Sequence, residues 1–268
     1  MHLTSEERAA GTMSPKNLAL AVRTLNDVGY VVLEEILPLD WVENARAQCD
    51  ADIAEFVANE LTPETNAERA GHVSMLAPMH APYTDAIAVE NPFALQVMEA
   101  AMGKNIYCMF YNTNTAYPGS MYQRLHRDIY LPFPELDHPL PAYMVVVNIP
   151  LIDFTLENGS TEVYPGTHHI TDIDPEDSQK LLERAQYLPA TRTNVKAGSL
   201  VVRDMRMWHR GMPNPSDTVR TMLAIVYGRG FWMTDPRMNQ IPRSTWDTFS
   251  EKSKYLFRNS PIIEDSKL

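Results

Sequence analysis

Residues 197–227 have the sequence AGSLVVRDMRMWHRGMPNPSDTVRTMLAIVY, which contains two runs rich in β-branched and other apolar residues. The runs are Ser199–Arg203 and Thr221–Tyr227, and the segment between them holds Gly, Pro, Asn and Asp, which favour turns. Three similar runs come earlier in the chain, at Ile106–Tyr111, Ala142–Ile149 and Thr161–Tyr164. Short strands separated by turns are typical of sandwiches and barrels. The pattern predicts a mainly β fold with a cupin-like jelly roll.

The segment before these strands has the apolar periodicity of helices. Ser14 is a candidate N-cap, Pro15 suits the first helical position, and Gly29 ends the helix. Asp40 and Glu43 resemble a capping-box pair at the start of a second helix. We therefore expect helices to precede the β-rich part.

Three further helices are expected in the rest of the chain. A third helix is expected from Asn91 to about Gly103, because Asn-Pro is a common helix start and Gly a common end. Asp174, followed by Pro, predicts a helix inserted between strands, and Ser244 predicts a last helix that continues to Phe257. The expected organisation is one domain over 1–268, with a helical part at about 1–105, a β core at about 106–232 and a helical tail.

Composition limits the classes of partner. The chain of 268 residues has a formal net charge of −11, which would repel a phosphate backbone, so no nucleic-acid partner is expected. No stretch approaches the roughly 18 apolar residues of a membrane span, and the N-terminus lacks the apolar region of a signal peptide. Cys49 and Cys108 are too few for a disulfide framework. We expect an intracellular protein that does not bind membranes and has two buried thiols.

A candidate metal site begins at His126-Arg127-Asp128. Residues two apart on an extended strand point to the same face, so His126 and Asp128 can serve as two ligands from one edge. His209, which follows a strand and precedes a turn, is the best candidate for a third ligand. Two histidines and one carboxylate form the facial triad of non-haem Fe(II) oxygenases, which leaves coordination positions open.

Arg220 suggests which co-substrate fills those positions. It lies eleven residues beyond His209, at the start of an apolar strand. A guanidinium there could form two hydrogen bonds to the distal carboxylate of 2-oxoglutarate, a geometry that suits Arg better than Lys. An ordinary surface salt bridge is the alternative.

Four blocks in a fixed order carry a family resemblance. They are His126-x-Asp128, ENGSTEVYPGTH at 157–168, AGSLVVRD at 197–204, and His209 with Arg220. In this order the blocks resemble the phytanoyl-CoA dioxygenase family. The resemblance implies a double-stranded β-helix, Fe(II) held by His126, Asp128 and His209, 2-oxoglutarate bound through Arg220, and O2 as oxidant.

Two further residues resemble those of fungal members that modify secondary metabolites. Gln123 and Thr161 are expected to assist in binding 2-oxoglutarate, although a solvated glutamine and a structural threonine are equally compatible with the sequence. The implied activity is oxidation of a C–H bond of a small hydrophobic metabolite, by hydroxylation, desaturation or rearrangement. Three alternatives stay open: a peroxisomal acyl-CoA hydroxylase, an iron enzyme that does not use 2-oxoglutarate, and a catalytically silent β-helix binding protein.

An apolar substrate pocket is expected beside the metal, because such pockets are mostly apolar with a few polar anchors. The candidate substrate residues are large apolar side chains close in sequence to the metal-bearing segments: Met121, Tyr130, Phe133, Met144, Trp208 and Phe231. Each could equally be ordinary core.

The other histidines are not assigned to the metal. His168 and His169 lie in a Pro-Gly-Thr-His turn and are expected to be structural, and His138 lies in a proline-rich loop and is expected to be solvated. His72 and His80 are possible substrate contacts only.

The sequence stops at Ser266-Lys267-Leu268, the tripeptide of peroxisomal targeting signals. In a eukaryotic source it predicts a peroxisomal location and a contact with the import receptor. The alternative is a solvated tail that ends in Leu by chance.

Overall fold

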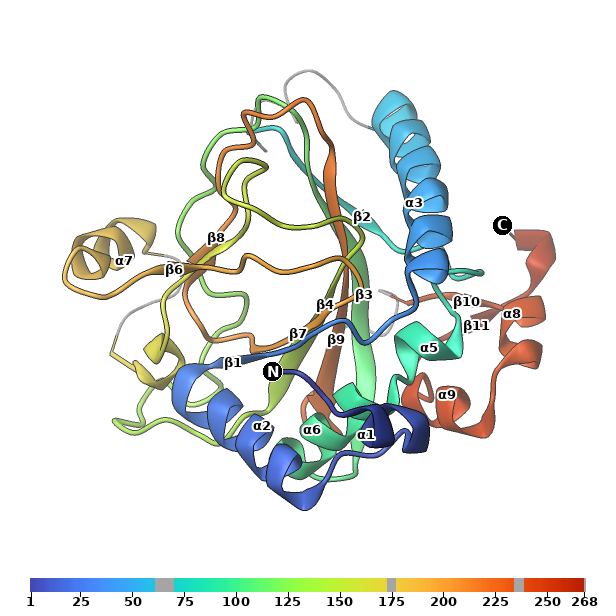
Figure 1. Ribbon diagram of the computed structural model, residues 1–268, viewed down its shortest axis with the longest axis horizontal. Coiled ribbons are helices and arrows are strands. Elements are labelled where there is room, and N and C mark those ends of the chain that lie inside the picture. The colour runs from blue at the N-terminus through green and yellow to red at the C-terminus, as the bar shows by residue number, and fades with distance from the viewer. Residues whose placement is uncertain (61–69, 173–176, 234–238, 268) are drawn as a thin grey trace.

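The computed structural model describes residues 1–60, 70–172, 177–233 and 239–267. Its centre is an antiparallel six-stranded sheet with the order β1-β7-β4-β9-β3-β2 (Figure 1). The strands are β1 (Tyr30–Leu33), β2 (His72–Leu76), β3 (Ile106–Ala116), β4 (Met144–Pro150), β7 (Leu200–Asp204) and β9 (Arg220–Arg229). A second, three-stranded sheet has the order β6-β5-β8. It consists of β5 (Glu162–Val163), β6 (Thr191–Arg192) and β8 (His209–Arg210).

Alternation along the strands gives the large sheet two different faces. Val145, Val147 and Ile149 of β4 belong to the main hydrophobic core, whereas Val146 and Asn148 between them line a cavity. The same alternation holds on β9, where Leu223 and Ile225 are in the core. Successive side chains of a strand point to opposite faces, so one set of strands builds both the core and the cavity wall.

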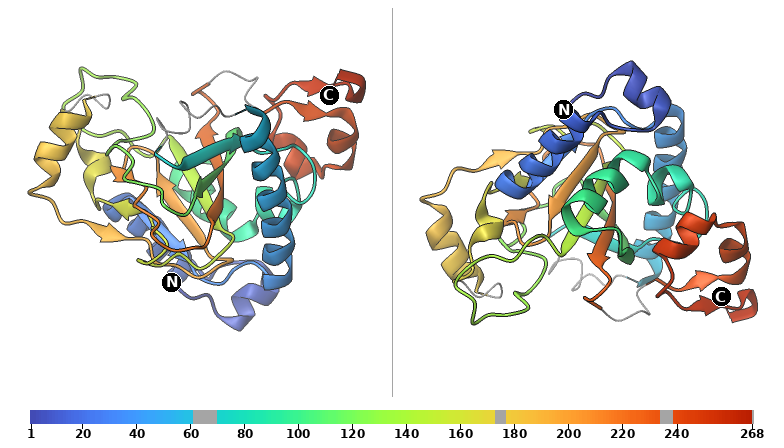
Figure 2. Two further views of the ribbon diagram at one scale, coloured as in Figure 1. Left: turned by 90° about the horizontal axis from the view of Figure 1, so that it is seen from above. Right: turned by 90° about the horizontal axis from the view of Figure 1, so that it is seen from below.

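Helices pack on the core face of the sheet, as Figure 2 shows from two sides. They are α1 (Ser5–Ala10), α2 (Pro15–Val28), α3 (Leu39–Glu60), α5 (Ala86–Val89) and α6 (Pro92–Met102). The C-terminal part adds α8 (Arg243–Thr248), α9 (Glu251–Leu256) and the parallel pair β10 (Ile241–Pro242) and β11 (Ile262–Ile263). A short helix, α7 (Ser178–Ala185), and two 3-10 turns, η1 (Thr167–His169) and η3 (Asp265–Lys267), complete the described elements.

Several local predictions are confirmed. The side chain of Ser14 caps α2 by accepting a hydrogen bond from the Asn17 amide, and Gly29 ends the helix with a φ of 96°. Asn91 caps α6 in the same way, and Gly103 follows its last residue. The antiparallel sheet with flanking helices confirms the mainly β fold.

Other local predictions are wrong. The capping box at Asp40 is not formed: α3 begins at Leu39, and the Asp40 carboxylate accepts from the neighbouring Trp41 amide. The expected last helix is two helices, because Phe249 is extended and Ser250 caps α9. The predicted helix start at Asp174 lies outside the described residues.

The predicted helical part also contributes two strands. β1 pairs with β7 and β2 with β3, so both edges of the large sheet come from the first third of the chain. These edges were not expected, because the partner strands are far away in sequence. The single domain over 1–268 stays a prediction.

Candidate metal centre

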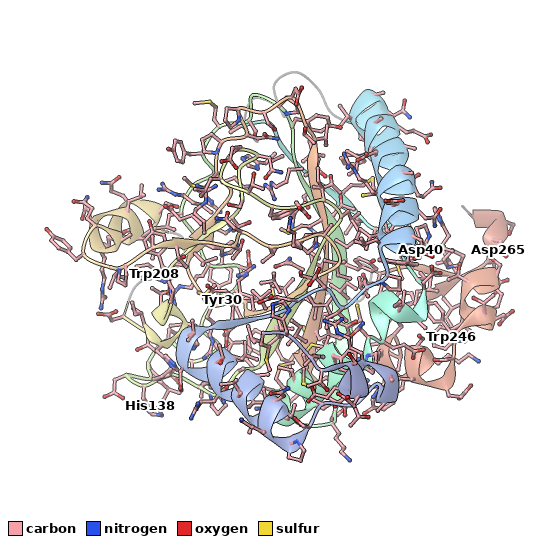
Figure 3. The ribbon with its side chains drawn as sticks, in the orientation of Figure 1. Tyr30, Asp40, His138, Trp208, Trp246 and Asp265 are labelled. Carbon is pink, nitrogen blue, oxygen red and sulfur yellow. The ribbon has the colours of Figure 1, made fainter. Side chains whose placement is uncertain are left out.

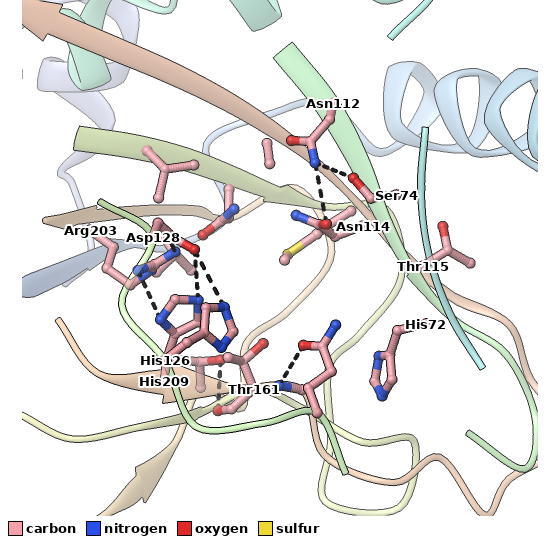
Figure 4. A pocket seen from close by; sticks show the side chains of 18 of the residues that line it. His72, Ser74, Asn112, Asn114, Thr115, His126, Asp128, Thr161, Arg203 and His209 are labelled. Atoms are coloured by element: carbon pink, nitrogen blue, oxygen red, sulfur yellow. Dashed lines mark hydrogen bonds and ion pairs between the residues drawn. The ribbon is translucent and has the colours of Figure 1, made fainter. Parts of the chain in front are cut away.

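The candidate ligands come from two segments that lie side by side as antiparallel neighbours. His126 and His209 exchange backbone hydrogen bonds of 3.1 and 2.9 Å, and the Asp128 amide donates to the Met205 carbonyl at 3.0 Å. Both imidazole Nε2 atoms lie 3.5 Å from Oδ1 of Asp128. The three ligand atoms lie within 4.8 Å of one another, as Figure 4 shows for the labelled triad. The structure thus brings together the three residues selected from the sequence.

The hydrogen bonds of the imidazoles favour metal binding. Nδ1 of His126 lies 2.8 Å from the Arg124 carbonyl, and Nδ1 of His209 lies 3.0 Å from the Met207 carbonyl. A carbonyl only accepts, so the contact with Arg124 favours the tautomer of His126 with its proton on Nδ1. For His209 the contact with the Met207 carbonyl, at 3.0 Å, is shorter than the 3.3 Å approach of the donor Nη1 of Arg203, and it favours the same tautomer. This tautomer leaves the Nε2 lone pairs free for a metal ion, and the carbonyls hold both rings in orientation.

Arg203 of β7 holds the carboxylate of the triad. Its Nη2 donates to Oδ2 of Asp128 at 2.7 Å, which leaves Oδ1 to face the two imidazoles. Its Nη1 also contacts Nδ1 of His209 at 3.3 Å. The guanidinium is almost fully buried, with a side-chain exposure of 7%. Arg203 was not selected from the sequence, where it is one polar residue in the strand LVVRD.

Charge and burial shift the pKa values of His209 and Asp128. Burial first, and then the charge of Arg203, lowers the pKa of His209 to about 3, so the ring is neutral at physiological pH. Desolvation raises the pKa of Asp128, but the permanent positive charge of Arg203, which donates to this carboxylate, acts in the opposite direction, and the pKa lies well below its usual value. A neutral imidazole and an ionised carboxylate are the forms that bind a divalent metal.

A cavity of about 760 Å³ opens beside the triad. Arg220, at the first position of β9, lines it with a side chain whose Nε and Nη1 have no hydrogen-bond partner within the described residues. The residue is 3% exposed, and its guanidinium lies 4.7 Å from the ring centroid of Phe154. Burial, and then the charge of Arg192, lowers its pKa to about 10. A buried and unpaired guanidinium requires an anionic partner.

Gln123 and Thr161 also line the cavity. Oε1 of Gln123 accepts from the Gly211 amide at 2.8 Å, so the side-chain NH2 is the part of this amide that can meet a ligand. Their contact with a co-substrate stays a prediction.

The six candidate substrate residues lie elsewhere. Met144 belongs to a small buried cluster with Tyr143, and Trp208 is fully buried in a cluster with Leu181 of α7 (Figure 3). The other four are among the exposed large apolar side chains: Met121, Tyr130, Phe133 and Phe231. None of the six lines the cavity, so we do not carry them forward as substrate residues. Closeness in sequence to the ligands was a poor guide, because neighbouring side chains on a strand point to opposite faces.

The remaining histidines have separate roles. His168 is buried, its Nε2 lies 2.8 Å from the Asn26 carbonyl, and it is not one of the candidate ligands. His138 is exposed at the surface (Figure 3), and His80 is exposed in a loop. His72 lines the cavity, where its Nε2 lies 2.7 Å from the Met121 carbonyl.

Two imidazoles and a carboxylate that line the cavity of a jelly roll are the ligand set of a mononuclear non-haem metal site, and these three residues could hold such an ion. The chain belongs to the phytanoyl-CoA dioxygenase (PhyH) family, whose family model matches residues 25–222.

Curated relatives are fungal. "Dioxygenase af480" of Aspergillus fumigatus is 29% identical over 179 residues, which are 64% of this chain and 54% of the relative. "Dioxygenase aneA" of Aspergillus aculeatus is 28% identical over 161 residues, 58% of this chain and 52% of the relative. The chain spans about half the length of these relatives.

Solved structures share the fold. The α-ketoglutarate-dependent carbocyclase SnoK from nogalamycin biosynthesis superimposes with a TM-score of 0.62 at 20% identity, covering 82% of this chain and 85% of SnoK. The epimerase SnoN, solved with Fe3+, α-ketoglutarate and nogalamycin RO, superimposes with a TM-score of 0.63 at 17% identity. The superposition covers 81% of this chain and 85% of SnoN. The likeness at this identity concerns the fold, and it confirms the predicted jelly roll.

The expectation of two buried thiols agrees with the structure. Cys49 and Cys108 are free and buried. No helix in the described parts of the chain is both long and apolar enough to cross a membrane.

Proposed function

We propose that this protein is a non-haem Fe(II)- and 2-oxoglutarate-dependent dioxygenase that oxidises a C–H bond of a small metabolite in secondary metabolism. The observation that carries the proposal is Arg220, which lies in the same cavity as the triad and whose buried Nε and Nη1 have no hydrogen-bond partner among the described residues. A silent binding protein would not require an unpaired buried cation beside an intact set of metal ligands. Hydroxylation, desaturation and rearrangement are all compatible with such a site.

The residues of the chain have distinct tasks in this reaction. Fe(II) bound with 2-oxoglutarate and O2 supplies an oxidant strong enough to break a C–H bond, and 2-oxoglutarate becomes succinate and CO2. His126, Asp128 and His209 would hold the metal on one face, and Arg203 keeps the Asp128 carboxylate turned toward it. Arg220 would bind the distal carboxylate of 2-oxoglutarate, since a guanidinium can donate two parallel hydrogen bonds.

The relatives support this assignment. Both fungal relatives are named dioxygenases, and the SnoK and SnoN structures are described as α-ketoglutarate-dependent enzymes of nogalamycin biosynthesis. An acyl-CoA substrate is less well supported. Of the three arginines that line the cavity in the described part of the chain, Arg203 is paired with Asp128 and Arg220 is assigned to 2-oxoglutarate, so Arg124 alone is left to meet the several phosphate charges of CoA.

Anaerobic titration with Fe(II) and 2-oxoglutarate tests the proposal. The wild-type protein should develop the visible metal-to-ligand charge-transfer band. Arg220→Ala should require roughly 10- to 100-fold more 2-oxoglutarate, because hydrogen bonds to charged groups contribute about 1.5–3 kcal/mol. Arg220→Lys keeps the positive charge but cannot donate two parallel hydrogen bonds. Its 2-oxoglutarate requirement should lie between those of the wild-type protein and Arg220→Ala. Absence of the band in the wild-type protein at saturating 2-oxoglutarate would refute the proposal.

The peroxisomal location stays a prediction. Ser266 and Lys267 belong to η3, and Leu268 lies outside the described residues. The tripeptide acts as a peroxisomal targeting signal only at a free C-terminus. A fluorescent protein that ends in Ser-Lys-Leu after residues 250–265 should accumulate in peroxisomes of a fungal host, and the same fusion without the tripeptide should not.

A further inference from the structure

One wall of the cavity is unexpectedly polar. Ser74 of β2, Asn112 and Asn114 of β3, and Asn148 of β4 all line the cavity, and we call these four residues the polar wall. They lie in neighbouring rows of the sheet: Ser74 pairs with Asn114, while Asn112 and Asn148 both pair with Ala224 from opposite sides. The register therefore gathers three amides and a hydroxyl on one cavity face.

Part of the polar wall is internally bonded, and part is left open. Nδ2 of Asn112 donates to Oγ of Ser74 at 2.6 Å and to Oδ1 of Asn114 at 3.3 Å (Figure 4). These bonds fix the two amides in orientation. They leave Oδ1 of Asn112 as an acceptor and Nδ2 of Asn114 as a donor toward a ligand.

The side-chain amide of Asn148 is a second, independent indication that the polar wall binds a ligand. The residue is 7% exposed and lines the cavity, yet its side-chain amide has no hydrogen-bond partner in the described part of the chain. The amide atoms of Asn148 are not among the fully buried unsatisfied side-chain atoms, so they are open to the cavity, where a ligand can meet them. The small side chain of Ala224 separates it from Asn112, so space for a ligand exists between the two amides.

The chemistry of the polar wall limits the ligand. All four side chains are neutral, and each amide can both donate and accept, which suits hydroxyl and carbonyl groups rather than a carboxylate or phosphate. Apolar side chains lie beside them, among them Leu76, Val201 and Met222. In Figure 4 Ser74, Asn112 and Asn114 lie apart from His126 and His209, toward the other side of the cavity.

We infer that the polar wall is the substrate-recognition surface, and that it takes a neutral, oxygenated carbon skeleton with at least two hydroxyl or carbonyl groups. The inference rests on the proposed function and names its substrate class. The oxygen groups meet Asn112, Asn114 and Asn148, the apolar carbon framework packs on the side chains between them, and the C–H bond to be oxidised faces the triad.

Ligand-observed NMR on protein loaded with Mn(II) and 2-oxoglutarate tests this inference. The probes share one bicyclic framework: tetralin, a hydroxytetralone with one hydroxyl and one ketone, and a tetralin carboxylic acid. Paramagnetic relaxation of the probe protons by Mn(II) reports whether a probe is bound near the metal site. The hydroxytetralone should bind about ten-fold more tightly than the other two, as expected for two neutral hydrogen bonds.

Single substitutions in the polar wall test which side chains cause the preference for hydroxytetralone. Asn112→Leu and Asn148→Leu, which are close in shape, should each reduce the preference for hydroxytetralone and leave tetralin binding equal or stronger. Thr113→Val is the matched control, because Thr113 lies between Asn112 and Asn114 on β3, is fully buried, and is not part of the cavity lining. It should leave the preference unchanged.

Any of three results with the probes would overturn the inference: equal binding of tetralin and hydroxytetralone, no measurable binding of hydroxytetralone, or a preference that both leucine variants retain. An Asn variant that changes the 2-oxoglutarate requirement instead of the probe preference would assign that amide to the co-substrate, and would also contradict it. The charge-transfer band of Fe(II) and 2-oxoglutarate is measured separately. A band without the probe preference rejects only the polar wall, whereas the preference without the band rejects only the dioxygenase assignment.

Discussion

At the scale of single residues, Arg203 of β7 is a side chain that contacts the candidate metal ligands from outside their own segments. One guanidinium contacts both the carboxylate and an imidazole of the triad, and it does so from a different strand. Residues that hold metal ligands in place commonly change metal affinity when they are replaced, without binding the metal themselves.

Arg203→Met is expected to lower the affinity for Mn(II) by about 10- to 100-fold, because Asp128 loses the group that orients it. Arg203→Lys should recover part of the loss. Titration of Mn(II) followed by electron paramagnetic resonance measures the affinity. Arg210→Met is a suitable control, since Arg210 follows His209 but pairs with Glu162. An unchanged affinity in Arg203→Met would show that Asp128 is oriented by other contacts.

At the scale of elements, the connection between α2 and β1 is tightly constrained. Gly29 has a φ of 96°, and a Cβ atom there would lie 2.7 Å from Nδ1 of His168 and 2.9 Å from Sδ of Met207. The close approach explains why the His168 turn is structural: it packs against the end of α2 rather than binding a ligand.

Gly29→Ala should lower the free energy of unfolding by about 2–6 kcal/mol, since both backbone strain and overpacking cost about 1–3 kcal/mol each. Gly11→Ala is the matched control. Gly11 also ends a helix with a positive φ, but a Cβ atom there would lie 3.9 Å from its nearest neighbour. Only the backbone strain remains, so Gly11→Ala should lower the free energy of unfolding by about 1–2 kcal/mol. Urea unfolding measures both variants, and equal losses would argue against the clash with His168.

Glu7 links α1 to α2. Its carboxylate accepts hydrogen bonds from the Ser14 amide at 2.6 Å and from the Asn17 side chain at 2.8 and 3.0 Å. These bonds, with that from Thr4, lower the pKa of Glu7 from 4.5 to about 2.

A pKa that is lower in the folded state stabilises the fold above the unfolded pKa, and this stabilisation is lost as the pH falls toward the folded pKa. Glu7→Gln should therefore have a lower melting temperature than the wild type at neutral pH. The difference should shrink as the pH falls from about 4.5 toward 2, the window set by the two pKa values. Thermal unfolding across this range is the measurement. A constant difference would mean that the ionised form of Glu7 is not what stabilises the helix pair.

At the scale of the whole molecule, the metal site connects segments that are distant in sequence. His126 and Asp128 come from the connection between β3 and β4, and His209 comes from the small sheet. A ligand that binds only the folded state stabilises it by mass action, so metal and 2-oxoglutarate should stabilise the entire β-helix.

Mn(II) and 2-oxoglutarate at about a hundred times their dissociation constants should each add about 2.7 kcal/mol to the free energy of unfolding. Differential scanning calorimetry should show this as a raised melting temperature. Asp128→Ala should abolish the shift from Mn(II). A wild-type melting temperature that does not respond to either ligand would contradict the placement of the site.

The sequence alone determined the class of fold, and it selected the three candidate metal ligands and Arg220, which the structure places around one cavity. Turn residues between β-branched runs predict strands, because these preferences are local, and the four ordered blocks identify the family without knowledge of strand pairing. The edge strands β1 and β2, the contact of Arg203 with Asp128, and the polar wall could not be predicted. Alternation along a strand shows that it has two faces, but only sheet register decides which face meets the cavity and which distant side chains share it. For the same reason the six large apolar residues chosen beside the ligands fell outside the cavity, while Asn112 and Asn148, which drew no attention in the sequence, meet across Ala224.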